Sequence, residues 1–116
     1  MDPTDYRYNL EYRGAVRAQM LALAKELIAG DLGVIAAARQ FHRFIDIPEP
    51  EISVLLDVFV GIHSETDALP IGEERSLWNS EALAREDKKV AAAEQAWRPE
   101  AIVAATQLVR ILEQNS

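Results

Sequence analysis

Apolar residues recur at helical spacing along nearly the whole chain. Residues 10–29 carry one apolar stripe with the spacing i, i+4, i+7 and i+11, formed by Val16, Met20, Leu23 and Leu27. Gly30 follows at a typical position for the end of a helix. Asp31 can cap a second helix over residues 32–45, and the short connection predicts an antiparallel helical hairpin.

Two prolines separate this hairpin from a third helix. Pro48 and Pro50 interrupt the helical pattern, and Pro50 suits the first turn of a helix over residues 50–63. The stripe of this helix is broad and consists of Ile52, Leu55, Leu56, Phe59 and Ile62. Because little of its surface is polar, we expect it to be the central helix.

The second half of the chain predicts two more helices. Ser80 is a good N-cap for a fourth helix, on which Leu83, Val90 and Trp97 repeat every seven residues. The pair Arg98–Pro99 predicts a break, with Pro99 opening a fifth helix. Near the N-terminus, Asp2-Pro3-Thr4 could start a further helical turn. We therefore predict an all-α, single-domain bundle of about five helices over residues 1–116, with an ordered loop between the third and fourth.

Composition and charge narrow the function classes. The 116 residues contain no cysteine, which excludes disulfides, thiolate metal sites and cysteine nucleophiles. Neither a membrane-spanning apolar run nor a secretory signal is present, so we expect a cytoplasmic protein without a membrane partner. Residues 1–44 carry six basic and five acidic residues, whereas residues 45–116 carry six and fourteen. This acidic half disfavours nucleic-acid binding and favours a basic protein partner.

The segment 62–78 is the stretch that does not fit a plain amphipathic helix. In one interpretation it is structural: Glu65 pairs with Arg75, while apolar side chains fasten the loop to the bundle, namely Leu69, Ile71, Leu77 and Trp78. In another it is a recognition surface in which an exposed Trp and Arg stand among carboxylates. The candidate binding residues are Glu65, Asp67, Glu73, Glu74, Arg75 and Trp78.

A third interpretation is a divalent metal site. His63, Glu65 and Asp67 offer nitrogen and oxygen ligands, but their alternate spacing brings them to one side only where the backbone is extended. His42 could complete such a site if the second helix passes nearby. No motif for a cofactor, a phosphate loop or a catalytic triad is present, and we expect no cofactor.

Several charged residues on the helices have simpler interpretations. Glu94 lies close to the core face of its helix, so we expect it to be partly buried and paired with an arginine. Arg13 and Arg17 lie one turn apart and are typical of a solvated face, although they could bind an anion. Arg39 and Arg43 have the same spacing, and we expect both to point to solvent.

The pattern S-E-T-D-x-L-P-x-G-x-x-R-x-x-W, residues 64–78, is similar to one carried by small uncharacterised bacterial all-helical proteins. The resemblance covers about the second half of the chain and implies a helical fold without a transferable function. Bacterial immunity proteins that neutralise toxins share the size, charge and helical class.

Taken together, the sequence favours a non-enzymatic protein–protein interaction module, immunity-like in character, that uses its acidic half and the 64–78 loop. The alternative is a small metal-binding protein or metal-dependent enzyme that uses His63, Glu65 and Asp67. Under either hypothesis the apolar remainder of the third and fifth helices could support a homodimer.

Overall fold

The first long helix follows from signals that lie next to it in the sequence. We analysed a computed structural model, which describes residues 9–114; the helical turn predicted at Asp2-Pro3-Thr4 lies outside this range. Helix α2 spans Leu10–Ala29, as predicted, and the Asn9 side chain accepts a hydrogen bond from the backbone N–H of Tyr12 at 3.0 Å. Gly30 ends the helix with a φ of 85°, a left-handed conformation that favours glycine.

Helix α3 is shorter than predicted, and its N-terminus is capped by a residue from another helix. It spans Val34–Phe41 and continues as a single 3-10 turn, η1, over His42–Phe44. Gly33 stands at the N-cap position and has no side chain to offer. The carboxylate of Glu94 accepts instead from the backbone N–H groups of Val34 at 2.7 Å and Ile35 at 3.0 Å. Glu94 is thus half-buried as expected, but it binds a helix terminus and not an arginine.

Helix α4 begins at Pro50, as predicted, and runs to Thr66, one turn further than expected. A second 3-10 helix, η2, spans Glu73–Leu77 in the segment that follows. α4 buries one face against α3 and α5, yet Val54 on another face is 67% exposed. Helix α3 and the last helix, α5, each pack against the three other α-helices, whereas α4, the predicted central helix, packs mainly against α3 and α5.

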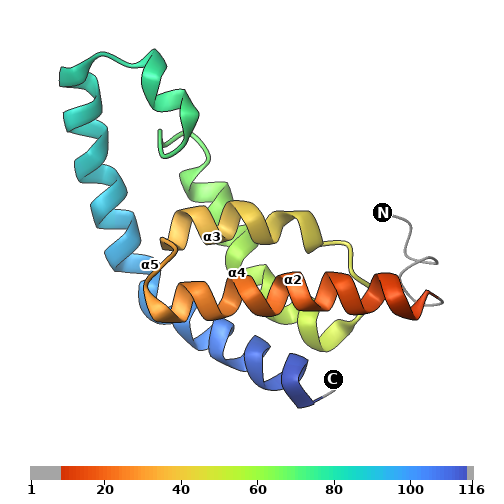
Figure 1. The fold of residues 1–116 in the computed structure, drawn as a ribbon. Coiled ribbons are helices and arrows are strands. Elements are labelled where there is room, and N and C mark those ends of the chain that lie inside the picture. Colours follow the sequence, from red (N-terminus) through yellow and green to blue (C-terminus); the bar gives the residue numbers. More distant parts are fainter. Residues whose placement is uncertain (1–8, 115–116) are drawn as a thin grey trace.

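Helix α5 replaces the predicted fourth and fifth helices. It is continuous over Ser80–Gln114 and contains Pro99 in its interior. Asn79, one residue before the predicted cap, accepts from the N–H of Ala82 at 2.8 Å. A proline in mid-helix lacks the N–H that would bind the carbonyl four residues earlier, and it commonly kinks a helix. In Figure 1, α5 changes direction where it passes from the projecting end of the molecule to the bundle.

Residues 9–114 contain four α-helices and two 3-10 helices, without a strand. Most of the core is buried where α2, α3, α4 and the second half of α5 meet. Small residues of α5 allow this close packing, namely Ala101, Ala104 and Ala105. By contrast, no residue from 71 to 100 is buried. We call residues 71–97 the arm; it projects from the bundle in Figure 1 and lengthens the molecule to 50 × 26 × 20 Å.

The contact between Glu94 and α3 should be measurable in the stability of the whole fold. Glu94→Ala would leave two backbone N–H groups at the start of α3 without their acceptor, and we expect it to lower the free energy of unfolding by about 1–2 kcal/mol. Gln95→Ala, a truncation at an exposed neighbouring position, should change it by less than about 0.5 kcal/mol. Urea unfolding followed by circular dichroism measures both; equal losses would contradict the role of Glu94.

Candidate functional site

Arg39 of α3 connects the bundle to the segment that follows α4. Its Nη1 binds Oε1 of Glu74 at 2.8 Å, and its Nη2 donates to the backbone carbonyl of Leu69 at 2.6 Å. A second carbonyl, that of Thr66, lies 3.4 Å from the same nitrogen. The prediction that Arg39 points to solvent was therefore wrong. The planar guanidinium carries several N–H donors in a fixed geometry, so it can bind a carboxylate and carbonyl groups at once.

Several residues of the S-E-T-D-x-L-P pattern have local structural roles. Thr66 is buried, and its hydroxyl donates to the carbonyl of Ile62 at 2.6 Å. Pro70 is also fully buried. A Cβ added at Gly72 would lie 2.7 Å from Oε2 of Glu74, so glycine leaves room for the carboxylate that Arg39 binds. Thr66, Pro70 and Gly72 thus determine the course of the backbone, and the exposed residues of the pattern are not needed for it.

Arg75 makes the second connection, this time to α5. Its guanidinium forms two hydrogen bonds to Asp87, at 2.6 and 3.2 Å, and a third to the carbonyl of Pro70 at 3.1 Å. The predicted pairing of Arg75 with Glu65 was wrong; Glu65 is exposed on the last turn of α4. We call the contacts of Arg39 and Arg75 the two-arginine clasp. It fastens the segment through polar groups, where we had predicted apolar packing.

These contacts shift the ionisation of the carboxylates. The hydrogen bond from Arg39 is the main cause that lowers the pKa of Glu74 from 4.5 to about 2. The hydrogen bonds from Arg75 lower the pKa of Asp87, and the same contact raises the pKa of Arg75. Glu74 and Arg75, two of the predicted binding residues, are thus engaged within the chain.

The other predicted binding residues remain accessible. Glu65, Asp67 and Glu73 are exposed. Leu77 is 86% exposed, so it does not fasten the segment to the bundle as predicted, whereas Trp78 is 38% exposed and more than half covered. Leu69 and Ile71 are half-buried. The segment therefore presents two adjacent apolar side chains to solvent beside a carboxylate.

The geometry of the predicted metal ligands differs from what that site requires. Because α4 continues to Thr66, His63 and Glu65 lie on a helix and point about 200° apart, so the extended backbone needed to bring them together is not formed. Across residues 9–114, no group of three or more His, Asp and Glu side chains is arranged to hold a metal ion. His42 does lie beside His63, with 4.5 Å between the ring centroids.

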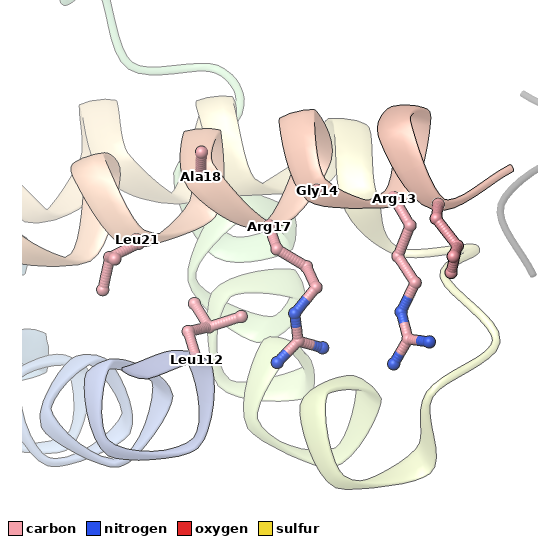
Figure 2. A pocket seen from close by; sticks show the side chains of 7 residues that line it. Arg13, Gly14, Arg17, Ala18, Leu21 and Leu112 are labelled. Atoms are coloured by element: carbon pink, nitrogen blue, oxygen red, sulfur yellow. The ribbon is translucent and has the colours of Figure 1, made fainter. Parts of the chain in front are cut away.

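A further charged cluster occurs where α2 meets the start of α4. Glu49 binds Arg13 at 2.9 Å and Arg17 at 2.5 Å, and the Arg17 side chain is only 11% exposed. Figure 2 shows both arginines extending from α2 toward the chain that enters α4, with Leu21 and Leu112 beside them. These residues line a pocket of about 350 Å³. The solvated face predicted for the two arginines is thus a partly buried ion pair network.

Sequence reasoning missed Arg39, Asp87 and Glu49 as partners because each contact joins residues that are distant in sequence. The role of Glu94 had no local signal either. The sequence offered Asp31 as a cap, whereas in the structure Gly33 stands at the N-cap position and the acceptor comes from α5.

The comparisons with known proteins return no relative. No family model matches the chain, and neither the curated proteins nor the solved structures include a match. Within residues 9–114, none of the helices combines the length and the apolar character needed to cross a bilayer.

The pairing of Arg39 with Glu74 predicts a specific dependence of stability on pH. Because the pKa of Glu74 is lowered, its carboxylate stabilises the folded state fully above about pH 4.5, and this contribution is lost as the pH falls toward 2. Glu74→Gln should therefore show a shallower fall of Tm between pH 4.5 and 2 than the native protein. Glu73→Gln, an exposed neighbour, should retain the native slope. Identical slopes for all three proteins would contradict the assignment.

Proposed function

We propose that the protein is a non-enzymatic protein–protein interaction module. It binds its partner through residues 71–78, which we call the tip of the arm. The observation that carries this proposal is the exposure of Leu77 and Trp78, at 86% and 38%, next to each other in one short segment. Large apolar side chains, Trp above all, are common anchors of interfaces. Exposing both to water is unfavourable unless another surface covers them.

The connections of this segment support an anchoring role. The two-arginine clasp attaches it to α3 through Arg39 and to α5 through Asp87. A recognition segment that is held in place loses less conformational entropy when it binds, because its backbone is already restricted. The clasp therefore favours binding without itself touching the partner.

The charge around the tip suggests the chemistry of the partner. Glu65 and Asp67 are exposed at the end of α4 and Glu73 is exposed at the start of η2, and residues 45–116 carry fourteen acidic and six basic residues. Such a surface attracts a basic protein and speeds its association. Neutralisation of a basic toxin, as immunity proteins do, is one activity that these features would serve.

The decisive experiment compares capture of a partner by variants of the tip. Tag-fused protein is used to isolate a partner, whose Kd is then measured by calorimetry. The double substitution Leu77→Ala and Trp78→Ala should weaken this Kd by at least about tenfold, because truncating a central anchor costs more than about 1 kcal/mol. Val54→Ala, which removes another exposed apolar side chain, this one from α4, should leave the Kd unchanged.

Charge reversal provides a second arm of this experiment. Glu73→Lys should weaken association at low salt and have less effect at high salt, as expected for a charge at the rim of an interface. Glu74 is unsuitable for this purpose, since its substitution would also break the clasp. A partner that binds the tip variants as tightly as the native protein would refute the proposal.

A further inference from the structure

The two histidines of the chain come together from different elements. His42 opens η1 and His63 lies on the last turns of α4, and their ring centroids are 4.5 Å apart with an angle of 42° between the planes. The chain contains two histidines in total, so both meet at this one place.

The core beneath the pair fixes its spacing. Phe41 and Phe59, which precede the histidines by one residue and by one helical turn, are buried and stack with centroids 4.4 Å apart. Aromatic stacking of this kind holds α3 and α4 at a defined separation. The imidazoles therefore stand on a rigid base, which a metal site requires if its ligands are to keep their geometry.

The Nδ1 atom of His63 is a buried polar atom without a hydrogen-bond partner in residues 9–114. Leaving such an atom unsatisfied is unfavourable, so native folds usually give it a partner. A metal ion would use the lone pair of an imidazole nitrogen and so remove this cost. Neighbouring imidazoles on different elements are also suitable ligands for one cation.

We infer that His42 and His63 form a two-histidine site for a borderline divalent transition metal ion, of the class Zn²⁺, Ni²⁺ or Cu²⁺. Imidazole nitrogen suits these ions, whereas Mg²⁺ and Ca²⁺ prefer oxygen ligands. Water completes the coordination from the solvent side, where His42 is exposed. This site keeps His63 of the set predicted from the sequence, replaces Glu65 and Asp67 by His42, and does not depend on the proposed partner.

Metal binding at this place would join η1 to α4 and stabilise the fold. An ion that binds only the folded protein, at about ten times its Kd, raises Tm by about 5 °C for a domain of this size. Tag-free protein should show such a rise with Zn²⁺, Ni²⁺ or Cu²⁺, and none with Mg²⁺. His42→Gln should abolish the rise; this residue is exposed, so the variant should keep its fold.

Further variants distinguish this site from other ways of binding metal. His63→Gln should also abolish the rise in Tm, whereas Glu65→Gln and Asp67→Asn should keep it. Electron paramagnetic resonance of one equivalent of Cu²⁺ should show coupling to two imidazole nitrogens in the native protein and to fewer in His42→Gln. The inference is overturned by the absence of any rise in Tm, by an unchanged rise in His42→Gln, or by its loss in Asp67→Asn.

Discussion

The hydrogen bonds between Glu94 and the start of α3 hold α5 against the bundle, and the position of the arm depends on them. The carboxylate lies on α5 and binds two backbone N–H groups some sixty residues earlier in the chain. The positive end of a helix and a carboxylate attract each other. The contact therefore gives the first N–H groups of α3 their acceptors and fixes the direction of α5. Trp97, one turn later, lies against Gly61 of α4, where a Cβ would be 3.9 Å from its ring.

From this contact the structure of the arm follows in steps. With α5 held in place, Asp87 lies within reach of Arg75, and α3 brings Arg39 within reach of Glu74. Both arginines then bind backbone carbonyls of the segment between α4 and α5. Individually, exposed ion pairs stabilise a fold by about 1 kcal/mol or less. Here they act on one short segment from two sides, which explains how it is placed without a buried side chain after Pro70.

Helix boundaries that depend on neighbouring residues were predicted correctly from the sequence. Those that depend on contacts with distant residues were not. Helix α2 begins and ends as predicted because the residues next to it determine both ends: Asn9 caps its start and Gly30 stops it. Helix α3 ends earlier than predicted, and its cap comes from Glu94. Pro99 can open a helix or lie within one; here the helix continues through it, and residues on both sides follow a helical pattern.

The candidate site shows the same division. The sequence identified the segment 62–78 and most of its exposed residues, because polar and aromatic side chains stand out there against amphipathic helices. It could not assign partners to Glu74 or Arg75, since Arg39 and Asp87 belong to other elements. His42 was named from the sequence as a possible partner of His63, but their proximity depends on how the region of α3 packs against α4.

The acidic surplus of the second half acquires a clearer meaning once these partners are known. Glu49, Glu74, Asp87 and Glu94 each meet an arginine or backbone N–H groups, so their charges stabilise the fold. Glu65, Asp67 and Glu73 stay exposed in the same stretch of the chain as Leu77 and Trp78. The charges that would attract a basic partner are therefore different from those that hold the arm, and a change in one set need not disturb the other.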